Sequence, residues 1–107
     1  SVYKLHLLTD VEITFVLTSG GHNAGIVSQP GHPRRNYRIA TRPERGEWRS
    51  ADEWLQTAER GERSWWPAWQ GWLAGHSSAP VKAKPIPASR ALADAPGTYV
   101  MQRYPGE

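Results

Sequence analysis

Hydrophobic side chains recur every three or four positions over residues 2–8, a spacing that predicts a helix of about two turns. Residues 12–17 are instead rich in β-branched and aromatic side chains, which predicts a strand. Apolar side chains fall on both faces of this strand, around Phe15 on one and Val16 on the other, so we expect it to be buried on both sides. Glycines end the strand, and His22 then lies just beyond its carboxyl end.

The middle of the chain predicts a small hairpin and a capped helix. Residues 25–28 and 36–40 have strand-like composition, and the prolines and glycine between them exclude a helix there. Residues 50–60 begin with a capping box, in which Ser50 stands three positions before a glutamate. Apolar positions at helical spacing follow, and Gly61 is the predicted end of this helix.

A second, tryptophan-rich helix is predicted between Ser64 and Gly75. A proline falls in its first turn, where a missing backbone N–H is tolerated. Several tryptophans share one face, which is typical of a helix that packs on a core. We expect that face to turn towards Trp54 and Leu55 of the preceding helix. The tryptophans concerned are Trp65, Trp69 and Trp72.

Composition changes along the chain and divides it in two. Aliphatic side chains are sparse among the 107 residues, but six Trp and four Tyr can each bury on the order of 150–250 Å², which supports one small folded unit over residues 1–75. Residues 76–107 are rich in Pro, Ala and Ser and predict a tail, in which only residues 98–101 have the composition of a docking strand. Because patterned apolar sequence follows Ser1 at once, we expect the chain to be a piece of a longer protein.

Cysteine content and the length of apolar runs exclude several classes of protein. The chain has no cysteine, which excludes disulfides, thiolate metal sites and a cysteine nucleophile within these residues. No apolar run is long enough for a transmembrane helix, so a cytoplasmic setting is expected. The four histidines lack metal-ligand spacing, and we expect neither a metal nor a cofactor.

His22 is the candidate catalytic residue. A lone histidine in a glycine-rich turn is commonly structural or simply exposed. A histidine on the loop that leaves the last strand of a parallel sheet, however, is where α/β-hydrolases hold their general base. The neighbouring glycines would let the loop bring the imidazole to a nucleophile from elsewhere. No G-x-S-x-G or G-x-C-x-G nucleophile motif accompanies it in this chain.

A run of arginines between positions 34 and 49 is the second candidate feature. Guanidiniums bind phosphates well, so Arg34, Arg35 and Arg38, which come soonest after the histidine loop, are the candidate substrate-binding residues. A solvated surface segment is the competing interpretation. The net charge is only +3 and acidic residues follow closely, so we expect no specific binding of nucleic acid.

Three segments of the chain together point to a family. They read FVLTSGGHNAGIV at residues 15–27, SWWPAWQGWLAG at residues 64–75 and APGTYV at residues 95–100. In this order they closely resemble the carboxyl-terminal end of class I and class II polyhydroxyalkanoate synthases, the family that makes poly-3-hydroxybutyrate. The resemblance covers nearly the whole chain.

The resemblance implies an α/β fold: the carboxyl-terminal fragment of an α/β-hydrolase, with its last helix and strand, the histidine loop, a short hairpin, two helices and an irregular tail. It implies an acyltransferase that moves 3-hydroxyacyl groups from coenzyme A thioesters to a growing polyester, using a Cys, His and Asp triad. His22 matches the family's catalytic histidine. The cysteine and aspartate motifs are absent here, so the isolated chain is expected to be inactive. A homodimeric parent enzyme at the surface of polyester granules is implied as well.

A non-catalytic binding module is the alternative from a different class. Its surface of arginines and tryptophans would bind an anionic or aromatic ligand, or nucleic acid. Under the first interpretation, the strand over residues 12–17 would lack its parallel neighbours, and unpaired edges promote association. We therefore expect an oligomer or a rearranged small sheet from the isolated chain.

Overall fold

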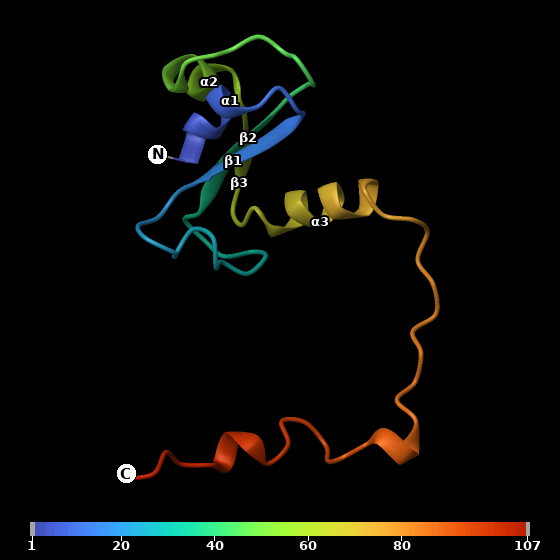
Figure 1. Cartoon of the computed structure of the whole chain (residues 1–107). Coiled ribbons are helices and arrows are strands. Elements are labelled where there is room, and N and C mark those ends of the chain that lie inside the picture. The colour runs from blue at the N-terminus through green and yellow to red at the C-terminus, as the bar shows by residue number, and fades with distance from the viewer. Residues whose placement is uncertain (1, 107) are drawn as a thin grey trace.

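A three-stranded antiparallel sheet with helices on both faces forms the folded part of the chain (Figure 1). The computed structural model describes residues 2–106. In sheet order the strands are β1 (Ile13–Thr18), β2 (Asn36–Arg42) and β3 (Glu59–Glu62). The helices are α1 (Leu5–Leu8), α2 (Ala51–Thr57) and α3 (Trp66–Gly75), and short 3₁₀ turns occupy Val2–Lys4, Ala88–Arg90 and Tyr99–Met101.

The amino-terminal helix and the first strand are confirmed, with a difference in burial. The helix predicted over residues 2–8 is present as a 3₁₀ turn that continues into α1. The strand predicted over residues 12–17 is β1. It is half-buried rather than buried on both sides, and Leu17 is 47% exposed. The reason is that β1 is an edge strand, so solvent reaches it from one side.

The hairpin predicted from residues 25–28 and 36–40 is wrong in its pairing. Residues 36–40 belong to β2, but β2 pairs with β1 in an antiparallel register. Residues 25–28 instead begin in a turn, because backbone amides there bond back to the Asn23 carbonyl and cannot join a ladder. The chain thus has a small antiparallel sheet in place of a strand with parallel neighbours, which agrees with the rearranged small sheet expected of the isolated chain.

The helix predicted over residues 50–60 is confirmed at its start and wrong at its end. Ser50 Oγ accepts a hydrogen bond from the Glu53 amide, and the Glu53 carboxylate accepts one from the Ser50 amide, so the capping box is formed. α2 ends before the predicted boundary, and β3 follows. Gly61 lies within β3 under the ring of Tyr37, where a Cβ would come within 2.1 Å of the tyrosine Cζ. Glycine is required there by close packing and not as a helix stop.

An aromatic cluster forms the core between the sheet and the helices α1 and α2. Trp54 of α2 is 6% exposed, and its ring meets that of Phe15 edge-on at 5.2 Å. Tyr3 also meets Phe15 edge-on, at 5.3 Å, and stacks on His6. Edge-to-face contacts of this kind stabilise a core beyond the apolar area that they bury.

α3 covers the opposite face of the sheet, which corrects the predicted packing of its tryptophans. Their side chains lie over Val16 and Ile39, and not against Trp54 and Leu55. The cause is β3, which lies between α2 and α3 in the sequence and carries the chain across the sheet. A cavity of about 200 Å³ remains between α3 and the sheet, so this face is loosely packed.

The tail runs away from the folded part (Figure 1). Residues 76–106 are exposed almost throughout, and the radius of gyration is 20.0 Å, against roughly 13 Å for a compact chain of this length. The strand predicted at residues 98–101 is wrong, because Tyr99–Met101 forms a 3₁₀ turn in which Tyr99 is 82% exposed. Among residues 2–106, no helix has the length and apolarity needed to span a bilayer.

Trp54→Ala is expected to lower the free energy of unfolding by roughly 3–5 kcal/mol, because it empties the centre of the aromatic cluster. Leu55→Ala on the same helix is the matched control: Leu55 is 41% exposed, and its loss should cost about 1 kcal/mol or less. Urea unfolding followed by circular dichroism measures both. Equal effects of the two substitutions would contradict this account of the core.

Candidate active site

His22 lies at the surface, in the connection between β1 and β2, and residues 19–28 of this connection are called the histidine loop below. The loop starts where the ladder closes: the Ser19 amide donates to the Asn36 carbonyl at 2.9 Å, and the Asn36 amide donates to Ser19 Oγ at 2.9 Å. Beyond this point His22 is exposed, and its backbone is left-handed, with a φ of 51°. The imidazole is therefore open to solvent just past the carboxyl end of β1.

Two glycines shape the turn around His22. Gly20 has a φ of +101°, and the Arg35 guanidinium lies so close that a Cβ on Gly20 would come within 2.8 Å of Nη1. Gly25 is buried, and a Cβ there would come within 2.1 Å of the Ser19 carbonyl oxygen. Glycine at both positions lets the loop fold back tightly onto the end of β1.

The second half of the loop is a short turn closed by a buried serine. The Val27 amide donates to the Asn23 carbonyl at 3.0 Å. Ser28 is 1% exposed, and its hydroxyl donates to the Ala24 carbonyl. The same hydroxyl accepts a hydrogen bond from Arg35 Nε at 3.2 Å. Ser28 thus joins the turn to the segment that leads into β2.

Side chains at the start of α3, which is distant in the sequence, form hydrogen bonds to the backbone of this turn. Ser64 is 4% exposed and donates its hydroxyl hydrogen to the Ser28 carbonyl. The indole N–H groups of Trp65 and Trp66 both donate to the Ile26 carbonyl, at 3.0 and 2.8 Å. Three consecutive side chains therefore hold backbone that lies 36 to 40 positions earlier in the chain.

The three candidate substrate-binding arginines have different surroundings. Arg34 is exposed, in a turn with a φ of 60°. Arg35 is half-buried and bonded to Ser28, so it braces the histidine loop. Arg38 lies within β2, opposite Leu17 of β1. Within the described chain, Arg35 is the one of the three that is bonded to the histidine loop.

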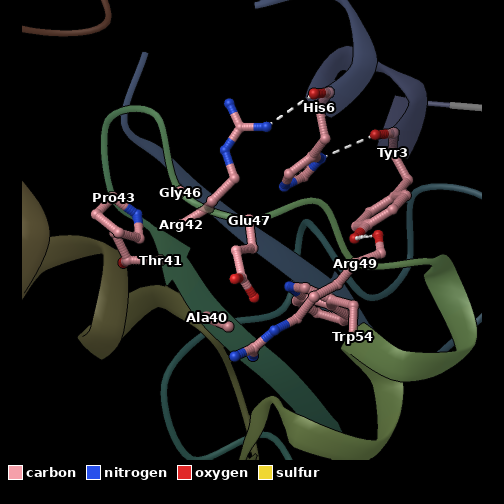
Figure 2. Close-up of a pocket in the computed structure, with 10 residues that line it drawn as sticks. All are labelled: Tyr3, His6, Ala40, Thr41, Arg42, Pro43, Gly46, Glu47, Arg49 and Trp54. Atoms are coloured by element: carbon pink, nitrogen blue, oxygen red, sulfur yellow. Dashed lines mark hydrogen bonds between the residues drawn. The ribbon is translucent and has the colours of Figure 1, made fainter. Parts of the chain in front are cut away.

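A separate pocket lies at the opposite end of β1, among α1, α2 and β2 (Figure 2). Its volume is about 230 Å³, and buried His6 and half-buried Arg42 line it. His6 Nδ1 donates to the Tyr3 carbonyl at 2.8 Å, and Arg42 donates to the His6 and Thr9 carbonyls at 2.7 and 2.6 Å. Burial raises the pKa of the Tyr3 phenol, against the opposing effect of the Arg42 and Arg49 guanidiniums. These polar groups serve mainly to hold the amino-terminal segment on the sheet.

The residues that hold the histidine loop cannot be recognised from the sequence. The spacing of the tryptophans predicts core packing, and no pattern singles out Ser28 or a contact of Ser64 with the loop. Hydroxyl and indole donors that act on distant backbone leave no periodic pattern in a sequence. The one signal that connects them is that the segments around His22 and Trp66 both resemble the same family.

The chain is similar along most of its length to curated polymerases. It is 39% identical over 95 residues to a poly(3-hydroxyalkanoate) polymerase subunit PhaC of Rhizobium etli, a match that covers 86% of this chain and 14% of the relative. It is 37% identical over 111 residues to poly(3-hydroxyalkanoate) polymerase 2 of Ectopseudomonas oleovorans, covering 96% and 18%. The subunit PhaC of Cupriavidus necator is 36% identical over 107 residues, covering 94% and 17%. No protein-family model and no solved structure matches the chain.

All three of these relatives are polymerases, and this defines the class of enzyme to which the chain is related. The chain belongs to the poly(3-hydroxyalkanoate) polymerase family, as a segment that spans 14 to 18% of the length of the curated relatives it matches. The family resemblance found in the sequence is thereby confirmed.

Gly25→Ala is expected to disturb the histidine loop, because the new methyl group would overlap the Ser19 carbonyl. Overpacking of this kind costs typically about 1–3 kcal/mol. Gly21→Ala is the control from the same loop, since a Cβ there meets no atom within 4 Å among the described residues. Thermal unfolding, with NMR shifts of the loop amides, measures both. Similar results for the two variants would argue against the close packing of Gly25.

Proposed function

We propose that this chain is the carboxyl-terminal part of the catalytic domain of a polyhydroxyalkanoate polymerase, and that His22 is the general base of that enzyme. The observation that carries the proposal is the similarity to polymerases over 86 to 96% of the chain. The exposed position of His22 just past the carboxyl end of β1 supports it, and the resemblance of residues 15–27 to the family implies a catalytic histidine at this position.

The form of the sheet supports a place within an α/β-hydrolase fold. Among the described residues β1 pairs with β2 on one side only, so its other edge carries unpaired backbone groups. A strand from another segment of the polymerase can pair there. β1 would then be the last strand of a larger sheet before the histidine, and His22 would stand on the loop where α/β-hydrolases hold their base.

His22 would act on a nucleophile outside this chain, which has no cysteine. Its neutral imidazole takes the proton of a cysteine thiol supplied by another segment. The thiolate attacks the thioester carbonyl of a 3-hydroxyacyl coenzyme A, and a new C–S bond forms. The bond to the coenzyme A sulfur breaks, and that sulfur leaves as a thiol with the proton returned by the imidazolium.

The same base serves the elongation step. The hydroxyl of one 3-hydroxyacyl unit attacks the thioester carbonyl of another while His22 takes the hydroxyl proton. An ester C–O bond forms, the C–S bond to the cysteine breaks, and the cysteine sulfur leaves as a thiol with the proton returned by the imidazolium. Both steps need a base that can reach substrate from the protein surface, and the exposed imidazole of His22 meets this requirement.

The other properties of the parent enzyme are proposed from the same resemblance. Residues 1–75 would complete the catalytic domain, and residues 76–107 would form a tail. The partners would be a 3-hydroxyacyl coenzyme A, the growing polyester and a second copy of the enzyme, at the surface of a cytoplasmic polyester granule. Because the chain holds one member of a triad, the isolated chain should release no more coenzyme A from 3-hydroxybutyryl coenzyme A than buffer does.

His22→Gln in the full-length polymerase is expected to lower kcat by roughly 10²–10⁴-fold, because glutamine cannot accept the proton. Coenzyme A release from 3-hydroxybutyryl coenzyme A measures it, and circular dichroism should show an unchanged fold. His32→Gln is the control, since His32 lies in the same connection between β1 and β2 and, among the described residues, its Nδ1 donates to the adjacent Pro33 carbonyl, at 2.7 Å. Near-normal turnover of the His22 variant would refute the assignment.

Changing Arg34 and Arg38 together to Gln in the full-length enzyme should raise the KM for the acyl coenzyme A several-fold if these guanidiniums attract its phosphates. Arg35 is left in place because it braces the histidine loop. The effect should shrink as salt is added, since the screening length is about 8 Å at 0.15 M. An unchanged KM at low salt would mean that Arg34 and Arg38 belong to a solvated surface that does not bind substrate.

Tight, salt-dependent DNA binding by the isolated chain would favour the alternative function, a non-catalytic binding module.

A further inference from the structure

Two consecutive indoles converge on one carbonyl oxygen beside the histidine. The Ile26 oxygen accepts a hydrogen bond from Trp65 Nε1 at 3.0 Å and from Trp66 Nε1 at 2.8 Å. A carbonyl oxygen has two lone pairs, and both are used here. Ile26 lies four residues after His22. Because both indoles belong to the start of α3, movement of the backbone at Ile26 is coupled to movement of that helix.

A pair of buried serines reinforces the contact. Ser64 Oγ donates to the Ser28 carbonyl and accepts a hydrogen bond from the Trp66 amide at 3.1 Å. It therefore ties the first turn of α3 and the histidine loop to a single hydroxyl group. Ser28 is 1% and Ser64 4% exposed, so water does not compete for these bonds.

We propose that Ser64, Trp65 and Trp66 form a positioning element for His22, an inference that rests on the proposed role of His22 as the general base. His22 is exposed on a glycine-rich loop, so burial in a core does not fix its imidazole. The sheet holds the start of the loop at Ser19, and the positioning element holds its end. His22 lies between these two anchors.

The catalytic importance of such anchors follows from the geometry of proton transfer. A general base must come within hydrogen-bond distance of the proton that it takes, about 2.6–3.2 Å between heavy atoms. Misplacement by about 1 Å can cost on the order of 10²-fold in rate. The three residues do not touch the reacting atoms in this arrangement, so they are positioning residues and not catalytic ones.

The test is the double variant Trp65→Phe with Trp66→Phe in the full-length polymerase. Phenylalanine keeps an aromatic ring and removes the N–H donor. We expect kcat to fall on the order of 10- to 100-fold with an unchanged KM for the acyl coenzyme A. We expect each single variant to lower kcat less than half as much, on a logarithmic scale, as the double variant does. The reason is that the other indole still holds the Ile26 carbonyl.

Trp69→Phe is the matched control on the same helix. Its ring stacks on Trp65 at 5.0 Å and lies over the sheet, so the substitution makes at one position the change in size that the double variant makes at two, and it alters packing on the sheet face. We expect a near-normal kcat. A loss equal to that of the double variant would mean that α3 acts only through general stability, and would overturn the proposal.

A second measurement follows the loop itself in the chain of 107 residues. The Val27 amide, bonded to the Asn23 carbonyl, should exchange its hydrogen at least about tenfold faster in the double variant, since local opening becomes easier. The amides shared by β1 and β2 should be unaffected. Unchanged exchange at Val27, or equal acceleration in the sheet, would overturn the proposal.

His22→Gln in the same polymerase separates the failure of this inference from that of the proposed function. If His22→Gln is inactive while the double variant keeps a normal kcat, the positioning role is refuted and the role of His22 stands. If His22→Gln keeps a normal kcat, the proposed function fails and the positioning role fails with it. If His22→Gln and the double variant both lose kcat while Trp69→Phe keeps a near-normal kcat, the proposed function and the positioning role are both supported.

Discussion

The pairing of β1 with β2 determines which side chains lie on each face of the sheet, and therefore what the helices pack against. Its register sets Phe15 against Ala40 and Val16 against Ile39, and neighbouring side chains of a strand point to opposite faces. Phe15 therefore meets Trp54 on one face, while Val16 lies under α3 on the other. A slip of one residue would exchange the two faces and separate both helices from their contacts.

The same pairing also brings the two parts of the candidate site to one end of the sheet. The ladder of β1 and β2 closes at Ser19 and Asn36, where the connection that contains the histidine loop begins and ends. Asn36 is also the register partner of Glu62, the last residue of β3, so the chain leaves the sheet towards α3 at the same end of the strands. The Arg63 amide donates to the Arg35 carbonyl at 2.6 Å just beyond it. The tryptophans meet the loop because both segments leave the sheet there.

Patterns between near neighbours in the sequence predicted elements, whereas contacts between distant residues could not be predicted. The capping box at Ser50 depends on a residue three positions away, and the composition of β1 is local, so both were evident. Gly61 was mistaken for a helix stop because its role depends on the ring of Tyr37, which belongs to another strand. The spacing of the tryptophans indicated one packed face, but no spacing can tell which surface that face will meet.

The candidate site shows the same division between local sequence patterns, which can be predicted, and contacts between distant residues, which cannot. His22 could be chosen from its glycine-rich surroundings and its family resemblance, but its loop cannot be ordered by its own residues alone. Fixing backbone costs about 1–2 kcal/mol per residue, and the few turn bonds around Asn23 offset only part of this for a loop of that length. Further stabilisation comes from Arg35, and from Ser64 and the adjacent indoles, which reach the loop only after β3 has carried the chain across the sheet. Ordering of the proposed base is therefore coupled to the docking of α3, although the two segments are far apart in the sequence.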